Sequence, residues 1–419
     1  MSAPEGPIVI VGAGQAGVQT AEALRSAGFA GSITLLGDEA HMPYHRPPLS
    51  KAWLAGEISA EQLVMRTAEA LARKNIELRL NCTVQAINTS AQTVTLTSGE
   101  VLPYCGLALS TGSTPRNLAL PGGNDPGVLP LRSRDNASSI AQRLTECADK
   151  GWPVVVIGGG FIGLELAATA SKKGLTVTVL EAAPRLLGRV LAPVLSEWYA
   201  ALHRSHGVTL VLCAQVQAIE AESAAACAIQ PPLNVRMNDG SHYPAGLVVV
   251  GIGVSANDTL AKAAGIDCDR GIIVDASART SAPHVVAAGD CTARRLDDGS
   301  LLRLESVQNA SEQGKSAAAA LLGQDRPFTS TPWFWSDQYD KKLQMAGLST
   351  GADSWAVRGD MASGNFSVFH FRAGLLLAVD SVNATKDHLL ARKLLDTSTS
   401  PTAQQAADTS FDLAGLLTR

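Results

Sequence analysis

The chain has 419 residues, of which 46% are hydrophobic and 17% charged, and its formal net charge is −4. This length allows two or three domains with their own cores, and the slightly acidic balance argues against broad nucleic-acid binding. No apolar run reaches the roughly 18 residues that a membrane-spanning helix needs, and the short polar start, residues 1–7, shows no signal peptide, so we expect a cytosolic protein.

The first predicted element is a β-branched strand, Ile8–Val11, which runs into the motif GxGxxG at Gly12–Gly17 and then into a small-residue helix over 18–24. The first glycine permits the sharp turn, the second lets a pyrophosphate approach the backbone, and the third lets helix and strand pack closely. The phosphates then face free N–H groups at the positive end of the helix. The segment therefore predicts a dinucleotide-binding unit.

The same arrangement returns 146 residues later. A second strand, Val154–Ile157, leads into Gly158–Gly163, and a helix rich in alanine and leucine follows. One GxGxxG is often only a tight turn, but two copies, each led by a strand and followed by a helix, indicate two bound nucleotides.

The residues after each motif separate the two nucleotides. The strand Thr176–Leu180 is followed by Glu181, whose carboxylate can accept both hydrogens of an adenosine ribose and would repel a 2′-phosphate, so NADH is favoured there. Arg185 lies four residues further on and leaves NADPH open. After the first motif, the strand 32–36 is followed by Gly37 and only then by Asp38, so a ribose contact of this aspartate is left open.

Three later strands end in glycine, at 107–112, 247–253 and 285–291, and fit crossings between domains beside a nucleotide. In the last of them, Gly289 would allow close approach to the backbone. Asp290 would then bind a ribityl hydroxyl of a flavin, although a helix N-cap or turn residue is an equally good interpretation of this aspartate.

Seven cysteines form no CxxC pair and no metal-binding cluster, which fits reduced thiols; they stand at positions 82, 105, 147, 213, 227, 268 and 291. The C-terminal part opens with three aromatic residues, Trp333–Trp335, followed by polar Ser336-Asp337-Gln338. Beyond them we expect strands over 366–371 and 375–379, a helix near 386–395 and a weakly ordered tail over 396–410.

Together these motifs resemble the FAD-dependent reductases of [2Fe–2S] ferredoxins, the putidaredoxin reductase-like family of bacterial cytochrome P450 and dioxygenase systems. The resemblance covers nearly the whole chain and rests on the segments 12–17, 43–51, 158–165, 289–291, 305–307 and 333–338. The proline-rich loop that ends at Lys51 and the tryptophan segment are its most specific parts. Two positions depart from the family pattern, Ser110 in place of an alanine and Ala256 in place of a proline, and both changes are small.

The resemblance implies an α/β fold of two nested Rossmann-like domains of the glutathione reductase type, plus a C-terminal α+β domain. An FAD-binding domain would comprise 1–113 and 246–326, an NADH-binding domain 114–245, and the C-terminal domain 327–419. FAD would be bound by Gly12, Gly14, Ala16, Gly17, Asp38, Lys51, Val84, Arg132, Asp290, Val307 and Trp335. NADH would be bound by Gly158, Gly160, Ile162, Gly163 and Glu181.

The candidate catalytic residues are Lys51, Glu165 and Trp335. Glu165 has apolar sequence neighbours, and a buried unpaired carboxylate is costly, so we expect an ion pair with Lys51 that positions the nicotinamide over flavin N5 and stabilises the reduced flavin. From spacing alone, a lysine here is more often a solvated residue in a first helical turn. The resemblance implies that Trp335 lies against the flavin face away from the nicotinamide, with Trp333 beside it, although core packing would also explain both aromatics.

An acidic ferredoxin would need a basic docking surface despite the negative net charge. The candidates are Arg66, Lys315, Lys341 and Lys342, with Arg294 and Arg295 as further possibilities, and each alone is more often an ordinary solvated residue.

The sequence therefore predicts a ferredoxin reductase that takes hydride from NADH onto FAD and passes electrons singly to a [2Fe–2S] ferredoxin serving a cytochrome P450 or another oxygenase. Two alternatives stay open. One is an NADH oxidase or peroxidase of the same fold, which usually needs a redox cysteine that the loop 41–51 lacks. The other is an NADH-sensing flavoprotein resembling apoptosis-inducing factor.

Overall fold

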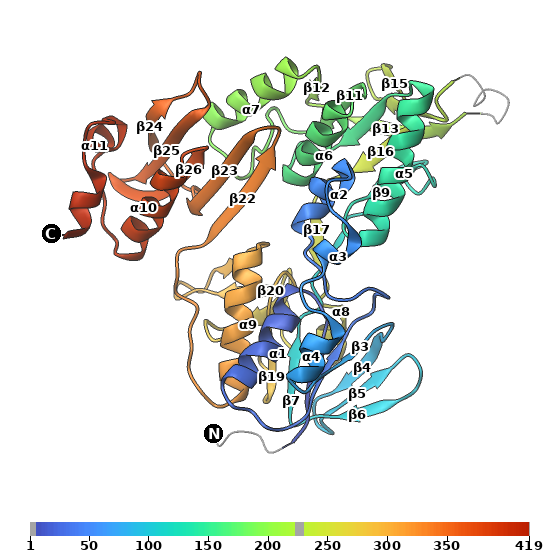
Figure 1. The fold of residues 1–419 in the computed structure, drawn as a ribbon, viewed down its shortest axis with the longest axis vertical. Helices are drawn as coiled ribbons and strands as arrows, with labels where there is room; N and C mark the ends of the chain where they lie inside the picture. The colour runs from blue at the N-terminus through green and yellow to red at the C-terminus, as the bar shows by residue number, and fades with distance from the viewer. Residues whose placement is uncertain (1–5, 223–229, 419) are drawn as a thin grey trace. The chain divides into compact units, whose positions relative to one another are not determined.

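The computed structural model describes residues 6–222 and 230–418, so Cys227 and the first five residues lie outside the described part. The chain forms two compact units, which Figure 1 shows as a ribbon. The first unit comprises Met1–His45, Ala60–Thr114 and Val254–Pro332. The second comprises Arg46–Ser59, Pro115–Gly253 and Trp333–Arg419.

The first unit is built on a five-stranded parallel sheet in the order β19-β7-β1-β2-β3. Its strands are β1 (Ile8–Val11), β2 (Ile33–Leu36), β3 (Ile76–Arg79), β7 (Gly106–Leu109) and β19 (Val285–Ala287). Four of these are short runs of mostly aliphatic residues, which suit strands that are buried on both faces. The strands predicted after and before the first glycine motif are thereby confirmed.

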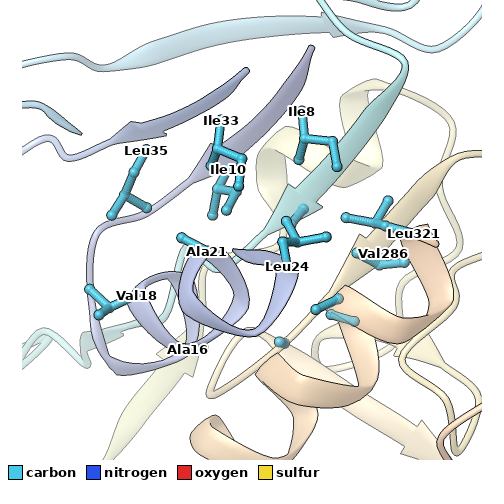
Figure 2. Close-up of a cluster of buried hydrophobic side chains, with 14 of the residues drawn as sticks. Ile8, Ile10, Ala16, Val18, Ala21, Leu24, Ile33, Leu35, Val286 and Leu321 are labelled. Atoms are coloured by element: carbon cyan, nitrogen blue, oxygen red, sulfur yellow. The ribbon is translucent and has the colours of Figure 1, made fainter. Parts of the chain in front are cut away.

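Two helices pack against each other and against this sheet, α1 (Gln15–Ser26) and α9 (Val307–Leu321). Figure 2 shows the core that they close, in which Ile8 and Ile10 of β1 lie over Ala21 and Leu24 of α1. All four side chains are fully buried. This core fixes the turn between β1 and α1, which carries the first glycine motif.

Smaller sheets and short helices complete the first unit. The three sheets are β4-β5-β6 (Val84–Asn88, Thr93–Leu96, Val101–Pro103), β8-β17 (Ser113–Pro115, Val254–Ala256) and β18-β20-β21 (Ile272–Val274, Thr292–Arg295, Leu301–Leu302). The helices are α3 (Ala60–Leu63), α4 (Ala68–Arg73) and α8 (Thr259–Ala263).

The second unit repeats the parallel sheet in the order β12-β11-β10-β16-β9. Its strands are β9 (Val128–Pro130), β10 (Val154–Ile157), β11 (Val177–Glu181), β12 (Thr209–Leu212) and β16 (Leu247–Val250). Strands β16-β10-β11-β12 repeat the order β7-β1-β2-β3 of the first sheet, with β10 corresponding to β1. The outermost strands differ, because β9 precedes β10 in the chain whereas β19 follows β7. The associated helices are α5 (Arg134–Lys150), α6 (Phe161–Lys172) and α7 (Pro193–Ser205), and an antiparallel sheet comprises β13 (Val216–Ala221), β14 (Leu233–Met237) and β15 (His242–Ala245).

The C-terminal part of the second unit is a five-stranded antiparallel sheet in the order β22-β23-β26-β25-β24, with helix α10 (Thr385–Asp396) packed on it. Its strands are β22 (Trp333–Gln338), β23 (Lys341–Gly347), β24 (Ser354–Asp360), β25 (Asn365–Arg372) and β26 (Leu375–Val382). The two strands and the helix predicted here are confirmed. The same unit contains the short helices η1 (Pro47–Ser50) and α2 (Ala52–Ala55).

The prediction of a weakly ordered tail over 396–410 is wrong. This segment contains helix α11 (Ala403–Ala407), which begins with a capping box of Thr402 and Gln405 and packs on β24. Arg358 of β24 also donates to the carbonyls of Thr409 and Phe411. The prediction took the polar composition as a sign of disorder. In the structure, polar side chains of this segment bond to backbone N–H groups at the start of a helix instead of to solvent. Helix η3 (Leu413–Thr418) follows, and Leu413 is buried.

Across the part of the chain that the structure describes, no helix combines the length and the apolar character needed to cross a bilayer.

Candidate active site

The first glycine motif forms the turn between β1 and α1. Gly12 has a φ of +107°, which favours glycine, and a Cβ atom on it would lie 2.1 Å from the carbonyl oxygen of Ser110. A Cβ on Gly17 would lie 1.9 Å from the carbonyl oxygen of Gly12, whereas one on Gly14 would meet nothing within 4 Å. Gly14 is the N-cap of α1 and supplies no side chain to its free N–H groups. The turn thus offers open space at a positive helix end, which fits a pyrophosphate.

The second motif repeats this geometry between β10 and α6. Gly158 has a φ of +111°, and a Cβ on it would lie 2.4 Å from the carbonyl oxygen of Gly251. A Cβ on Gly163 would lie 2.2 Å from the carbonyl oxygen of Gly158, while one on Gly160 would meet only an oxygen at 3.9 Å. Gly160 caps α6 without a side-chain hydrogen bond. Ile162, next in the turn, is among the exposed large hydrophobic residues.

The acidic residue after the second motif is held by the backbone. One oxygen of Glu181 accepts the N–H of Gly159 at 2.5 Å, and the other accepts the N–H of Ala183 at 2.7 Å. The guanidinium of Arg185 donates instead to the carbonyls of Gly188 and Leu191 and to the hydroxyl of Ser196. The arginine that left NADPH open is therefore committed to its own loop.

The corresponding position after the first motif has no acid. Because Val11 pairs with Leu36 as Ile157 pairs with Leu180, Gly37 occupies the place of Glu181. A Cβ on Gly37 would lie 3.0 Å from the Cβ of Ala13. Asp38 follows as an exposed residue.

The other flavin-site candidates of the first unit lie at element ends. Asp290 accepts a hydrogen bond from the Ser113 hydroxyl at 3.0 Å, next to Gly289 with its φ of +88°. Val84 begins β4 and Val307 begins α9. The Ser110 hydroxyl lies behind the glycine turn, 3.0 Å from the carbonyl oxygen of Val11 and 2.8 Å from that of Gly12, and has an acceptor for its hydrogen there. The serine that departs from the family pattern is therefore accommodated.

Lys51 and Glu165 form the predicted ion pair, within the second unit. The ammonium of Lys51 lies 2.7 Å from Oε2 of Glu165, and the side chains are 19% and 2% exposed. Glu165 lies on α6, two residues after Gly163, and Lys51 lies between η1 and α2. The Thr169 hydroxyl donates to the carbonyl of Ser50 at 3.0 Å and so attaches this loop to α6.

Two further donors complete the carboxylate's partners, and the sequence did not reveal them. The Ser50 hydroxyl donates to Oε2 of Glu165 at 2.5 Å, and the Ser336 hydroxyl donates to Oε1 at 2.7 Å. Both serines are buried. Period-two alternation in β22 was an available signal, since it puts Phe334, Ser336 and Gln338 on one face of the strand. Phe334 contacts Phe161 at the start of α6, with ring centroids 4.9 Å apart.

Trp333 and Trp335 lie on the other face of β22, with ring centroids 5.7 Å apart. Trp333 contacts the ring of His388 edge-on, and the guanidinium carbon of Arg392 lies over Trp333, 5.1 Å from the ring centroid. Both tryptophans are only partly buried. Arg132 belongs to the same unit, where its carbonyl accepts a hydrogen bond from Arg46 at 2.9 Å.

Several candidate docking cations have partners of their own. Arg66 pairs with Glu22, Lys315 with Glu312 and Lys341 with Asp340, all at 2.7–2.8 Å. Arg294 donates to the carbonyl of Phe328 and lies over its ring. Lys342 and Arg295 are exposed. Arg66 and Lys315 belong to the first unit, and Lys341 and Lys342 belong to the second.

Six cysteines fall in the described part of the chain, and all are free thiols. Burial raises the pKa of Cys147 and of Cys268 to about 11, which keeps these thiols protonated and unreactive. Within residues 6–222 and 230–418, no group of three or more His, Cys, Asp or Glu side chains is arranged to hold a metal ion.

A family model described as pyridine nucleotide-disulphide oxidoreductase matches residues 6–314, and a second, described as reductase C-terminal, matches 333–417. The chain belongs to the pyridine nucleotide-disulphide oxidoreductase family. Members of this family use FAD and a pyridine nucleotide, and the two glycine turns fit these groups.

Relatives of known activity cover almost the whole chain. Rhodocoxin reductase of Rhodococcus erythropolis is 46% identical over 407 residues, which are 97% of this chain and 93% of the relative. The solved ferredoxin reductase for the CYP199A2 system from Rhodopseudomonas palustris has a TM-score of 0.92 and 42% identity over 98% of this chain and 99% of the other. The covalent putidaredoxin reductase–putidaredoxin complex matches with a TM-score of 0.93 and 40% identity, over 99% and 98%.

Proposed function

We propose that this protein is an NADH-dependent ferredoxin reductase that uses FAD to convert a two-electron donor into single electrons for a [2Fe–2S] ferredoxin of an oxygenase system. The observation that carries the proposal is the ion pair of Lys51 with the buried carboxylate of Glu165, which lies on the helix that follows the second glycine motif. Full-length similarity to reductases of this activity supports it.

When bound, FAD accepts a hydride from a reduced nicotinamide and releases the two electrons separately. The chain's own contribution is binding and orientation. Gly12, Gly14 and Gly17 would receive the FAD pyrophosphate with Ala16 between them, and Gly158, Gly160 and Gly163 would receive that of NADH, with Ile162 beside it. The open space at Gly14 and Gly160 supports these assignments.

The remaining cofactor assignments are proposals of the same kind. Asp38, Val84, Arg132, Asp290 and Val307 would contact FAD, in a domain formed by 1–113 and 246–326. Glu181 would accept the ribose hydroxyls of NADH in a domain formed by 114–245, since both its oxygens keep a second lone pair after accepting one backbone N–H each. The commitment of Arg185 to backbone carbonyls favours NADH over NADPH.

Lys51 and Glu165 would act together at the nicotinamide. The carboxylate holds the lysine side chain in one place, so that the reactive ring is received in a fixed orientation. Replacing Lys51 by alanine should slow NADH-driven flavin reduction strongly in stopped-flow experiments. An unchanged rate in Lys51→Ala would remove this role.

The electron acceptor would be an acidic ferredoxin that approaches the side of Trp333 and Trp335, with Trp335 shielding the flavin. Lys342 and the partly engaged cations Arg66, Lys315 and Lys341 would supply positive charge for docking. We place this transient encounter, and the enzyme itself, in the cytoplasm.

The decisive test uses the FAD-loaded protein with NADH, NADPH and candidate ferredoxins. Electron transfer to a [2Fe–2S] ferredoxin should fall steeply with added salt, while NADH–ferricyanide activity stays nearly constant. A flat salt response would contradict electrostatic docking. Oxygen consumption that outpaces ferredoxin reduction would favour an oxidase, and a long-lived reduced complex that reoxidises slowly would favour a sensor.

A further inference from the structure

A continuous line of buried polar side chains leads away from Glu165 through the second unit. The Ser336 hydroxyl contacts Oε1 of Glu165, and Nε2 of Gln338 lies 3.2 Å from the Ser336 hydroxyl. Oε1 of Gln338 then lies 2.9 Å from Nε2 of His203 on α7. The line ends at Tyr339, whose hydroxyl lies 3.1 Å from Nδ1 of the same histidine.

All three inner side chains are sealed from solvent. Ser336, Gln338 and His203 each have a relative exposure of 0%. Tyr339 is partly buried and stacks on His206 at the end of α7, with ring centroids 3.7 Å apart. A buried polar network costs stability unless each member is satisfied, and here each of the three inner side chains has its hydrogen-bond partners.

The carboxylate at one end fixes the direction of every hydrogen bond. An ionised Glu165 can only accept, so Ser336 donates its single hydrogen to it and must accept from Gln338. This determines the amide orientation, because a flipped Gln338 would place its oxygen against a hydroxyl whose hydrogen is already used. The amide oxygen therefore faces His203, which must carry its hydrogen on Nε2 and accept at Nδ1 from Tyr339.

The protonation states of the outer residues agree with this direction. Burial lowers the pKa of His203 to about 4, assisted by nearby His206 and opposed by the bond to Gln338, so the ring is neutral near pH 7. Burial raises the pKa of Tyr339 to about 12, so its hydroxyl keeps the hydrogen that it donates. Four donors, from Tyr339, His203, Gln338 and Ser336, thus point in series toward one carboxylate.

We propose that His203, Gln338 and Ser336 are positioning residues of the reductase, which hold the Glu165 carboxylate with Oε2 turned to Lys51. The series occupies Oε1 and leaves Oε2 to Ser50 and Lys51. Aligned dipoles that end on an anion also stabilise its charge in a site where water does not reach. The consequence for catalysis rests on the function proposed above, whereas the direction of the bonds does not.

The direction of the hydrogen bonds in this series can be measured without enzyme turnover. In the ¹⁵N-histidine spectrum of the FAD-loaded protein, assigned with His203→Gln, His203 should appear as the neutral Nε2–H tautomer and should not titrate between pH 8 and about 5, the range set by its low pKa. An Nδ1–H tautomer, or a titration midpoint near the ordinary value, would overturn the proposed series even if the enzyme reduces ferredoxin normally.

The effect on Glu165 is tested with Ser336→Ala and the matched control Ser367→Ala. Both serines are fully buried in the C-terminal sheet, but Ser367 bonds to Ser381 and Asp387, away from Glu165. Ser336→Ala should slow flavin reduction at saturating NADH about tenfold, the size expected for one lost hydrogen bond to a charged group, with little change in the NADH concentration for half-maximal rate. Ser367→Ala should stay within about twofold of wild type in the same assay.

Substitutions of His203 separate bonding from packing. His203→Gln retains a donor in place of Nε2 and should keep most of the wild-type rate, whereas His203→Leu should lose about threefold or more because the series is interrupted two bonds from the carboxylate. Equal rates in both variants, or equal losses in Ser336→Ala and Ser367→Ala, would reject the positioning role. If wild-type flavin is not reduced by NADH at all, the proposed function fails, and the tautomer measurement still decides the series.

Discussion

The two glycine turns share a backbone but differ in the side chains around it. In both, a Cβ on the third glycine would lie within 2.2 Å of the first glycine's carbonyl oxygen, and the second glycine opens onto free space. The helices that follow differ one turn later, where Gln19 of α1 corresponds to Glu165 of α6. A Cβ on Gly314 of α9 would lie 3.1 Å from the Cβ of Gln19, so this glutamine packs between helices, whereas Glu165 holds Lys51.

The strand ends differ as well. Glu181 stands at the end of β11 and is fixed by two backbone N–H groups, while Gly37 occupies its place after β2. The similar turns therefore differ in charge, because the second has the Glu181 carboxylate and the Lys51–Glu165 pair near it, and the first has Gly37 and Gln19 at the corresponding positions. The repeated backbone fits two nucleotides, and under the proposed function the side chains found only in the second copy would orient the nicotinamide.

Closing each turn separately should have the largest effects. Gly17→Ala should abolish FAD binding, and Gly163→Ala should retain FAD while raising the dissociation constant for NADH about 100-fold or more, because the new methyl group displaces the turn. FAD content by absorbance and NADH binding by titration measure the two effects. Each variant is the control for the other. Loss of FAD from Gly163→Ala would show that the two turns are not assigned as proposed.

Substitutions of Glu165 and Gln19 should show the next largest difference, in the rate of flavin reduction by NADH. Glu165→Gln keeps the shape but removes the charge that holds Lys51, and should slow NADH-driven flavin reduction about 50-fold. Gln19→Ala, at the corresponding position of the first helix, should leave the rate within about twofold. Stopped-flow reduction gives both numbers. A Gln19→Ala protein as slow as Glu165→Gln would mean that the two helices are not functionally distinct.

The strand-end acids should give a smaller contrast. Glu181→Ala should weaken NADH binding about tenfold and NADPH binding much less, because the carboxylate that accepts the ribose hydrogens is also the group that repels a 2′-phosphate. Asp38→Ala should weaken FAD binding by no more than about threefold, because this exposed aspartate lies one residue beyond the corresponding place. Equal effects of the two substitutions on the binding of their nucleotides would contradict the expectation that Asp38, unlike Glu181, lies beyond the ribose-binding position.

Local patterns in the sequence were enough for the strands next to both motifs and for those at 366–371 and 375–379, but they did not reveal β3, β9 and β12. They also suggested that Glu165 needs a positive partner, since a carboxylate among leucines and alanines is costly when unpaired. Alternation in β22 could have placed Ser336 on the face of Phe334, but the hydrogen bonds of Ser50, Ser336 and His203 could not be predicted. They depend on η1, α6, α7 and β22 meeting in space. The tail was misjudged for a different reason, since Thr402 and Gln405 form a local capping box whose spacing was visible in the sequence but was taken as polar composition.

The smallest expected effect is that of acid on the free energy of unfolding of the second unit, which contains His203 and His388. Burial lowers the pKa of both His203 and His388 to about 4, whereas an unfolded histidine titrates near pH 6.5. The unfolded chain therefore binds more protons between these values, so the stability is complete above pH 6.5 and falls as the pH drops toward 4. At pH 5.5 the loss should be about 1 kcal/mol for each histidine.

Tryptophan fluorescence isolates this effect, because all six tryptophans belong to the second unit. Urea unfolding followed by tryptophan emission should show the decrease between pH 7.5 and 5.5. His388→Asn should lower stability at pH 7.5 through the lost packing against Trp333 but should show a flatter pH dependence than wild type, since one of the two depressed groups is gone. An unchanged slope would mean that this ring is already charged in the folded protein, which its burial beside Arg392 and Lys342 makes unfavourable.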